Sequence, residues 1–217
     1  MKPSIGRDVR TPTAAVERTL SLEGFRAIAG VDEAGRGAWA GPLVAGAVIL
    51  PASVIRRPAW SRTIRDSKLV PEDERTYLAG IIRGHAVAVG VGAVAPEVID
   101  LLGLTAAGHL AMWRALRSLA VGPDYVLVDA FRIPDLTVPQ RAIVHGDLLC
   151  VSIAAASIIA KTVRDGLLCE LDERFPEFGY ARNKGYGTAV HRAGLDRVGP
   201  TGQHRHSYAP VAAMLRP

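Results

Sequence analysis

The sequence lacks the features that would indicate a zinc protein or a secreted protein. Its only two cysteines, Cys150 and Cys169, form no C-x-x-C pair and have no histidine at metal-ligand spacing, so no structural zinc site is expected. Isolated thiols on or beside one apolar stretch are typical of reduced core residues in a cytoplasmic protein. The N-terminal residues contain no apolar h-region, and no apolar run approaches the ~20 residues that a membrane span needs. We therefore expect a cytoplasmic protein with no membrane partner.

A large excess of one charge is also missing. The net charge is +5 and the pI about 9.6, which is compatible with an anionic partner but is common in proteins that bind nothing acidic. The excess is uneven, because residues 180–206 carry five basic residues and one acidic residue. Hydrophobic residues make up 49% of the 217 residues and charged residues 22%, so the composition predicts a packed domain and excludes wholesale disorder.

Hydrophobic patterning predicts an α/β domain. Short apolar segments bounded by glycine, proline or acids predict strands, and apolar residues at intervals of three and four predict helices. Strands that first follow one another and then alternate with helices are typical of a mixed sheet flanked by helices. The predicted strands are residues 25–35, 43–50, 85–94, 125–130 and 141–147, and the predicted helices are residues 101–119 and 149–171.

The chain divides into three parts. Residues 1–23 are polar and without clear periodicity, and we interpret them as a flexible leader or a short helix. Residues 24–175 contain all the predicted strands and long helices. Residues 176–217 are rich in glycine, histidine and arginine, which predicts short helices and loops.

Asp32 and Glu33 are the most informative acidic pair. Adjacent strand residues point to opposite faces, so the two carboxylates reach one site only if the strand ends or kinks there, as Gly35 and Gly37 permit. For the pair alone, a solvated turn with two surface acids is the commoner explanation, and the preceding residues make the two explanations about equal. The preceding apolar run favours burial, and buried charges are costly unless they are paired or bind metal.

Asp129 repeats this pattern, because it follows the apolar residues 125–128 at the end of a predicted strand. The ends of parallel strands are where ligands gather, although an aspartate that begins a turn gives the same pattern. Clustered carboxylates suit hard cations such as Mg²⁺ and Mn²⁺, which take oxygen ligands and share phosphate oxygens with a substrate. Two such ions can activate water and stabilise the leaving oxygen in a displacement at phosphorus.

Asp147 and Asp165 compete for the place of a fourth carboxylate. Asp147 precedes the helix predicted over residues 149–171, so it is either a ligand or the N-cap of that helix. Asp165 is four residues after Lys161 on one helical face and has a surface ion-pair partner there. Eighteen helical residues separate the two aspartates by roughly 27 Å, which excludes a site that uses both. We choose Asp147.

The segment Gly35-Arg36-Gly37 has two interpretations. The next glycine is Gly41, one residue too late for the G-x-G-x-x-G fingerprint, and a proline and a strand follow, which argues against dinucleotide binding. A Gly-x-Gly turn lets backbone amides approach a ligand while Arg36 reaches a phosphate. A simple tight turn accounts for the segment equally well.

The basic C-terminal segment contains two further candidates. Tyr186 lies between Gly185 and Gly187 beside basic residues, where it either stacks on a base or sugar or packs in the core. His204 and His206 form a His-x-His pair, which is a weak metal signal alone, and we interpret it as structural or phosphate-facing.

Together these segments resemble the ribonuclease HII family. The resemblance runs from Phe25 to Val211 in the family's order of motifs. Its motifs are IAGVDEAGRGAWAGPLVAGAVIL (28–50), DSKLV (66–70), VLVDA (126–130), SIAAASIIAKTVRD (152–165), NKGYGT (183–188) and HRHSYAPV (204–211).

The resemblance implies a ribonuclease H-like fold with a mixed five-stranded sheet, a catalytic domain over residues 24–175 and a C-terminal helical substrate-binding extension over residues 176–217. It implies a Mn²⁺- or Mg²⁺-dependent endonuclease, which we expect to be a monomer. Such an enzyme hydrolyses the RNA strand of RNA–DNA hybrids and incises duplex DNA 5′ of single ribonucleotides, leaving 3′-hydroxyl and 5′-phosphate ends.

Site residues follow from the matching motifs. The implied metal ligands and catalytic residues are Asp32, Glu33, Asp129 and Asp147. The implied substrate contacts are Gly35, Arg36 and Gly37 to the 2′-hydroxyl and adjoining phosphates, Tyr186 to the sugar at the RNA–DNA junction, and Lys68 to DNA phosphates.

Two residues depart from the family's pattern. His145 replaces the usual lysine, so the charge beside Asp147 is expected to depend on pH. Tyr208 replaces the usual phenylalanine, which is expected to be benign.

Residues 1–23 are too short for the N-terminal domain of ribonuclease HIII, which disfavours that relative. A hybrid-binding module without catalysis is disfavoured by the intact set of acids, because clustered carboxylates without metal repel phosphate.

Overall fold

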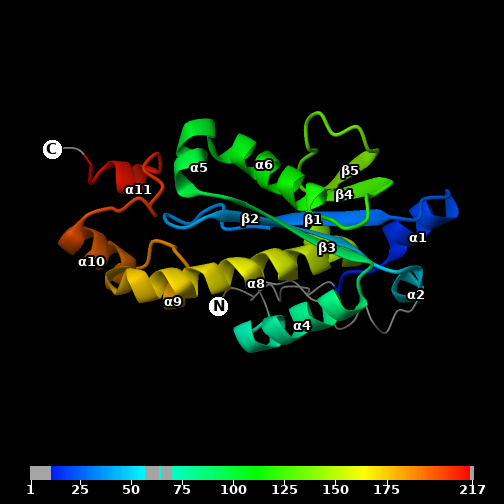
Figure 1. Cartoon of the computed structure of the whole chain (residues 1–217), viewed down its shortest axis with the longest axis horizontal. Helices are drawn as coiled ribbons and strands as arrows, with labels where there is room; N and C mark the ends of the chain where they lie inside the picture. The colour runs from blue at the N-terminus through cyan, green and yellow to red at the C-terminus, as the bar shows by residue number, and fades with distance from the viewer. Residues whose placement is uncertain (1–10, 57–63, 65–69, 216–217) are drawn as a thin grey trace, which may run out of the picture.

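The computed structural model describes residues 11–56, 64 and 70–215, and its centre is a five-stranded sheet with strand order β3-β2-β1-β4-β5 (Figure 1). The strands β3, β2 and β1 are antiparallel neighbours, whereas β1, β4 and β5 run parallel. The mixed sheet predicted from the sequence is therefore confirmed. The strands are β1 (Ile28–Ala34), β2 (Leu43–Ile49), β3 (Ala88–Val94), β4 (Tyr125–Asp129) and β5 (Gln140–Ile143).

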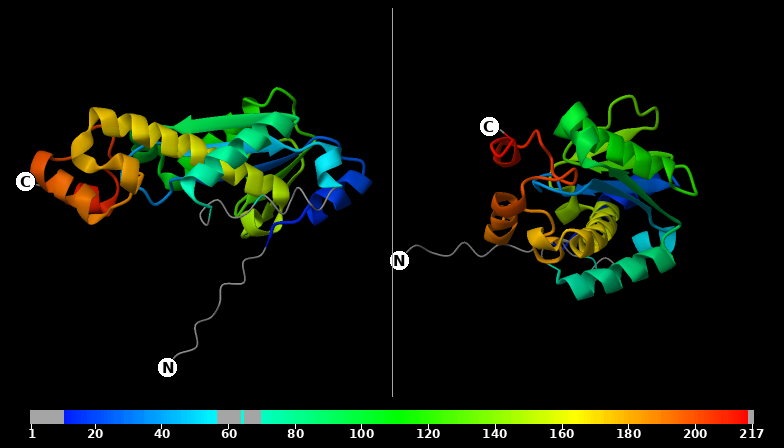
Figure 2. Two further views of the ribbon diagram at one scale, coloured as in Figure 1. Left: turned by 90° about the horizontal axis from the view of Figure 1, so that it is seen from below. Right: turned by 60° about the vertical axis from the view of Figure 1, so that its left-hand side comes forward.

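Helices cover both faces of the sheet. Figure 1 shows α5 and α6 on one face and α8 on the other, with α4 on the outer side of α8, and Figure 2 shows the last helices gathered at one end of the molecule. The helices are α1 (Ala15–Leu22), α2 (Ala52–Ile55), α4 (Glu72–His85), α5 (Pro96–Leu102), α6 (Leu104–Arg117), α7 (Gly146–Leu149), α8 (Val151–Arg174), α9 (Tyr180–Asn183), α10 (Ala189–Val198) and α11 (Ala209–Ala212), with a 3₁₀ turn at Pro176–Phe178.

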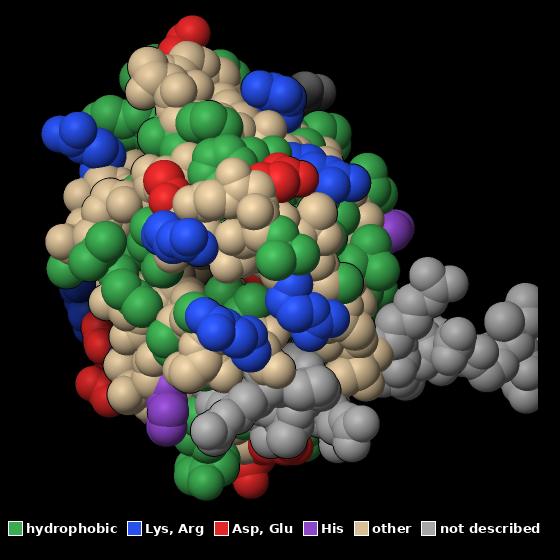
Figure 3. All heavy atoms as spheres, turned by 90° about the vertical axis from the view of Figure 1, so that its right-hand side faces the viewer, with side chains coloured by type: hydrophobic (Ala, Val, Ile, Leu, Met, Phe, Trp, Pro, Cys, Tyr) green, Lys and Arg blue, Asp and Glu red, His purple; other side chains and the backbone are tan. Residues whose placement is uncertain are grey.

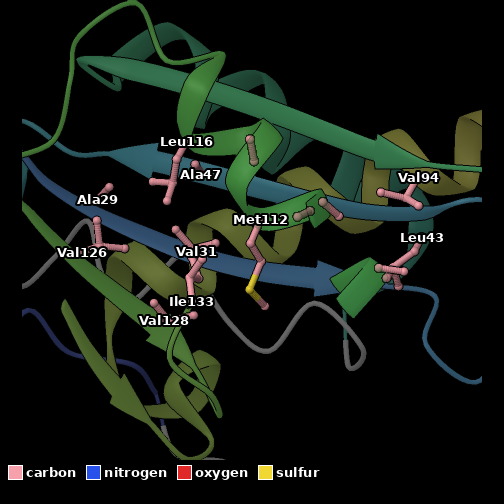
Figure 4. Close-up of a cluster of buried hydrophobic side chains, with 14 of the residues drawn as sticks. Ala29, Val31, Leu43, Ala47, Val94, Met112, Leu116, Val126, Val128 and Ile133 are labelled. Carbon is pink, nitrogen blue, oxygen red and sulfur yellow. The ribbon is translucent and has the colours of Figure 1, made fainter. Parts of the chain in front are cut away.

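The core has one layer on each face of the sheet. Between the sheet and α6, side chains such as Val31, Met112 and Val128 are buried together (Figure 4). On the other face, residues 151–160 of α8 are buried on every side, because α8 lies between the sheet and α4. A helix surrounded by protein is apolar all round, which explains why the single apolar stripe expected for residues 149–171 understates its burial.

The backbone of α8 comes unusually close to the sheet at two glycines. A Cβ atom added to Gly30 on β1 would lie 2.1 Å from the carbonyl carbon of Ser152, and one added to Gly46 on β2 would lie 2.4 Å from the carbonyl oxygen of Ala156. Only glycine fits at such a distance, so these residues determine how near α8 lies to β1 and to the acids that β1 carries.

Several element boundaries differ from expectation for local reasons. The single helix expected over residues 101–119 is two helices, α5 and α6, separated by Gly103 at φ +78°. The strand expected to reach residue 147 ends at Ile143, because the chain turns at His145 with φ +57°. Helix α4 was not predicted, although its acidic first turn and the spacing of Leu78 and Ile82 are a helical pattern.

The N-terminal segment is packed where it is described. Residues 1–23 were interpreted as a flexible leader or a short helix. Residues 15–22 form the short helix α1, so the flexible leader is wrong for these residues. Glu17 of α1 is fully buried and accepts hydrogen bonds from the backbone N–H and the hydroxyl of Ser152, at 2.9 and 2.7 Å. The carboxylate thereby caps the first turn of α8 from another element.

Both cysteines are free thiols within the described residues. Cys150 is buried and Cys169 is half-buried. No helix in the described ranges is long and apolar enough to cross a membrane.

Candidate active site

A cavity of about 240 Å³ opens where β1 and β4 end beside α8. It brings together all the site residues predicted from the sequence except Asp147, which lies next to Asp129, and Lys68, which lies outside the described residues. The residues that line it are Asp32, Glu33, Ala34, Gly35, Arg36, Gly37, Asp129, Ser157, Lys161 and Tyr186.

Asp32 and Glu33 reach the cavity from opposite faces of β1. Strand β1 continues one residue beyond the pair, to Ala34, and the chain then turns at Gly35 with φ +97°. Asp32 is 4% exposed and hydrogen-bonded to Ser157 on α8, whereas the Glu33 carboxylate pairs with the guanidinium of Arg36 at 3.2 Å. The cavity therefore lies across the end of the sheet, where both faces can contribute side chains.

Asp129 and Asp147 are joined by a backbone hydrogen bond. The N–H of Gly146 donates to Oδ1 of Asp129 at 2.7 Å, which places the next residue, Asp147, against the end of β4. Asp147 is 4% exposed and is the second residue of α7, whereas α8 begins at Val151. The alternative of Asp147 as the N-cap of the long helix is therefore wrong, because the short turn α7 intervenes.

The acids of the cavity act on one another electrostatically. Burial and the charges of Glu33 and Asp129 raise the pKa of Asp32 well above its ordinary value, and Asp147 contributes in the same direction. Burial also raises the pKa of Glu33, with Asp129 adding to the rise and Arg36 opposing it. A cluster of buried carboxylates is stabilised by a cation, which removes their mutual repulsion.

These donors fit a hard divalent cation. They are carboxylate oxygens at the rim of an open cavity, and carboxylate oxygen is the ligand type that Mg²⁺ and Mn²⁺ prefer. Within the described ranges, no group of three or more histidine, cysteine, aspartate or glutamate side chains already has the spacing of a metal-binding shell. Mg²⁺ is usually held by one or two carboxylates together with water and substrate phosphates, so such a shell is not needed for a site of this kind.

Two buried arginines lie against the segment Gly35-Arg36-Gly37, named the glycine loop from here on, or against the residues that follow it. Arg164 on α8 is fully buried and donates to the carbonyls of Ala40, Pro42 and Lys184. Arg205, also fully buried, donates to the carbonyl of Arg36 at 2.9 Å. These bonds leave the Arg36 side chain 37% exposed at the cavity.

Gly35 must be glycine for two reasons. Its φ of +97° is a conformation that other residues rarely adopt, and a Cβ atom there would lie 2.0 Å from Nε of Arg164. The tight-turn interpretation of Gly35-Arg36-Gly37 is thus correct for the backbone, and the same turn lines the cavity.

Tyr186 is at the edge of the cavity rather than in the core. The residue is 41% exposed, and its ring lies 5.8 Å from the guanidinium carbon of Arg164. Its carbonyl oxygen accepts hydrogen bonds from the N–H of Thr188 at 2.8 Å and from Nδ1 of His191 at 3.0 Å. An anchored backbone with an exposed ring is an arrangement suited to stacking.

His204 and His191 form a buried pair behind Tyr186. The N–H of Thr201 donates to Nδ1 of His204, so the proton of His204 is on Nε2. Nδ1 of His191 faces a carbonyl and must carry a proton, so its Nε2 accepts from Nε2 of His204 at 3.0 Å. Both imidazoles are neutral, and the structural interpretation of His204 is correct.

The histidine pair predicts a pH-dependent stability. Burial and His191 lower the pKa of His204 to about 4, whereas an unfolded histidine has a pKa of about 6.5. The unfolded chain therefore binds more protons between these values, and stability falls as pH falls through that window. We expect the free energy of unfolding to decrease by about 2 kcal/mol from this group between pH 7 and pH 5.

Urea denaturation of the wild type and of His204→Gln at both pH values measures this contribution. His204→Gln should show a smaller decrease, and His85→Gln, on the exposed side of α4, should match the wild type. An equal decrease in His204→Gln would contradict the assignment of neutral imidazoles, whatever the absolute stability of the variant.

Two polar residues of the cavity were not predicted as site residues. Ser157 and Lys161 lie four residues apart on α8, on the face that meets the cavity. The signal was present, since polar residues at helical spacing interrupt an otherwise apolar segment. Asp165, the next residue in that series, is buried and not at the surface as expected: its oxygens pair with Lys161 and with Arg75 of α4.

The sheet order and the acids at the ends of the neighbouring strands β1 and β4 define the ribonuclease H-like class of nucleases. Ribonuclease H2 from Pyrococcus horikoshii OT3 superimposes with a TM-score of 0.73 at 26% identity, covering 86% of this chain and 96% of that one. Bst-RNase HIII in complex with Mn²⁺ superimposes with a TM-score of 0.70 at 20% identity, covering 88% of this chain and 69% of that one. At this identity the likeness is one of fold alone.

The ribonuclease HII family model matches residues 29–211. A curated ribonuclease HII from Dehalococcoides mccartyi is 46% identical over 204 residues, which cover 94% of this chain and 96% of the relative. The chain belongs to the ribonuclease HII family. It is accordingly an endoribonuclease of the ribonuclease H class, which acts on RNA–DNA hybrids and depends on divalent metal.

Proposed function

We propose that the cavity at the ends of β1 and β4 is the catalytic centre, and that it incises duplex DNA 5′ of a single embedded ribonucleotide as well as cutting long hybrids. The ends left are a 3′-hydroxyl and a 5′-phosphate. The observation that carries the proposal is the joining, in one cavity, of clustered carboxylates with a glycine loop and an exposed tyrosine. We also propose that the monomer is active, because one chain supplies every group used below.

The carboxylates are the proposed metal ligands. Asp32, Glu33, Asp129 and Asp147 would hold Mg²⁺ or Mn²⁺, which supplies an activated water and stabilises the leaving 3′-oxygen. The hydrogen bond from Ser157 orients Asp32, and the N–H of Gly146 orients Asp129. Such second partners hold ligand oxygens in place for binding.

The glycine loop is the proposed reader of the ribonucleotide. Only an RNA residue has a 2′-hydroxyl, so a site that selects it needs donors or acceptors fixed beside the sugar. The backbone from Gly35 to Gly37 lines the cavity without side chains to obstruct approach, and Arg205 fixes the carbonyl in its middle. The ring of Tyr186 lies beside this loop, 3.7 Å from the position that a Cβ atom on Gly37 would take, and would pack against the same sugar.

Incubation of a DNA duplex containing one ribonucleotide with the protein and Mn²⁺ or Mg²⁺ tests the proposal. Scission 5′ of the ribonucleotide, abolished by EDTA, is the expected outcome, and an all-DNA duplex should remain intact. Cutting of long hybrids with no cut at the single ribonucleotide would refute the finer specificity while leaving the hybrid activity of the family untouched.

Arg36→Ala is expected to weaken ribonucleotide discrimination more than duplex affinity. The loss of a charged hydrogen-bond donor at the cavity should reduce cleavage at a single ribonucleotide by at least about tenfold, with duplex binding reduced by less than about threefold. Arg83→Ala on the exposed surface of α4 is the matched control. Cleavage rates and anisotropy binding curves measure the two effects, and equal losses in both would assign Arg36 to general phosphate binding instead.

A further inference from the structure

A line of polar side chains follows one face of α8 from the acids toward Tyr186. Ser157, Lys161 and Asp165 are spaced four residues apart, so they lie one above another on the helix. Ser157 reaches Asp32, and Lys161 lines the cavity one turn further along. The ammonium of Lys161 is thus a cationic group of the cavity wall. It lies on the α8 side of the sheet, whereas Glu33 enters the cavity from the other face of the sheet.

Asp165 holds this ammonium from behind. Its Oδ1 lies 2.5 Å from Nζ of Lys161, and its Oδ2 lies 2.6 Å from Nη2 of Arg75 on α4. The side chains of Asp165 and Arg75 are 3% and 7% exposed, whereas that of Lys161 is 21% exposed. A chain of three charges therefore runs from α4, through the protein interior, to the one member that meets the cavity.

The charges of this triad do not cancel. One carboxylate serves two cations, so the group of three carries a net positive charge. Lys161 has three N–H donors, and the hydrogen bond to Asp165 uses one. A contact that only joined α4 to α8 would need Arg75 and Asp165 and would not need Lys161. Buried ion pairs also contribute little net stability by themselves, so stability alone does not explain the triad.

We propose that Lys161 binds a backbone phosphate of the nucleic acid in the cavity, and that Asp165 and Arg75 are positioning residues that hold its ammonium toward that phosphate. The inference rests on the proposed assignment of the cavity as the substrate site. It gives Asp165 a role other than that of a metal ligand, for which its oxygens are already engaged by two cations.

Steady-state cleavage of a long RNA–DNA hybrid, at salt concentrations from low to moderate, tests Lys161. In Lys161→Met the KM should rise about tenfold with kcat within about twofold of wild type, because a charged hydrogen bond to substrate is lost. The slope of log KM against log salt should become shallower by about 0.9, the value for one phosphate contact. Lys161→Arg, which keeps the charge, should restore most of the loss.

Asp165→Asn tests the positioning role. It should raise KM less than Lys161→Met does, and the double variant should resemble Lys161→Met alone, because both changes act through one contact. Glu72→Gln is the matched control: it removes a different ion pair of α4, to Lys184, and should leave KM unchanged. Thermal melts establish that each variant is folded.

Two results would overturn the inference. A Lys161→Met variant with unchanged KM and salt slope would leave the triad a docking contact only. An Asp165→Asn variant that loses kcat at unchanged KM would identify Asp165 as part of the reacting centre. Neither result depends on the single-ribonucleotide activity, since the hybrid serves as substrate, and a failure of the cavity assignment itself would be seen separately in Asp129→Asn.

Discussion

Asp129→Asn is expected to reduce cleavage of an RNA–DNA hybrid by about 10³-fold or more, because it removes one of the carboxylates proposed to hold the catalytic ions. The substitution is close to a change of charge alone. Oδ1 of Asp129 accepts the N–H of Gly146 at 2.7 Å, and the amide oxygen of asparagine can accept the same bond. The approach of α7 to β4 should therefore survive, and with it the place of Asp147.

Metal affinity and stability provide readouts besides activity. Removal of a carboxylate from the cluster relieves repulsion on Asp32 and Glu33, so the free protein should be no less stable than the wild type. Mn²⁺ binding measured by calorimetry should weaken. Asp73→Asn, an exposed acid in the first turn of α4, is the control that should cut at the wild-type rate.

The outcome distinguishes the candidate carboxylates. Cleavage by Asp129→Asn within tenfold of wild type would refute the assigned centre. Asp147→Asn should lower activity in the same direction as Asp129→Asn, whereas Asp165→Asn should keep its kcat. Single-turnover rates with saturating enzyme separate these effects from changes in substrate binding.

The parts of the fold that could be predicted are those governed by neighbours in sequence. Alternating or continuous apolar residues bounded by glycine, proline or acids identified all five strands, and the acids at the ends of β1 and β4 followed from them. Positions that need glycine, such as Gly35, leave a signal in the sequence because no other residue fits their conformation.

The parts that could not be predicted depend on contacts between distant segments. Asp165 and Lys161 were expected as a surface pair, but Asp165 is buried because α4 covers that part of α8 and supplies Arg75, 90 residues earlier in the chain. Helical spacing shows which side chains share a face but not what covers the face. The same limit hid the carboxylate of Glu17, which caps α8 from the N-terminal segment.

The helix start was misplaced for a related reason. Asp147 before an apolar run has the pattern of an N-cap, but the chain turns at His145 and forms the short helix α7 before α8 begins. Gly146 permits this turn, because its missing Cβ leaves room for Asp129 and Ile153. Asp147, which has the sequence pattern of an N-cap, is therefore a buried carboxylate near Asp129.

Gly30→Ala is expected to lower the free energy of unfolding by about 3 kcal/mol, the upper part of the range for overpacking a core. The added methyl group would meet the backbone of α8, with Ser152 and Ile153 atoms between 2.1 and 2.4 Å away. Backbone cannot rotate aside as a side chain does, so either α8 or β1 must move. Urea denaturation at pH 7 measures the effect.

Gly80→Ala is the matched control and should change stability in the opposite direction. Gly80 lies on the exposed side of α4 with no atom within 4 Å of an added Cβ, so alanine there should stabilise the helix by about 0.5–1 kcal/mol.

Because Gly30 lies two residues before Asp32 on the same strand face, a displaced α8 would also draw Ser157 away from Asp32. Gly30→Ala should therefore lose activity even under conditions where it is folded, and full activity with wild-type stability would show that α8 can shift outward without consequence for the cavity.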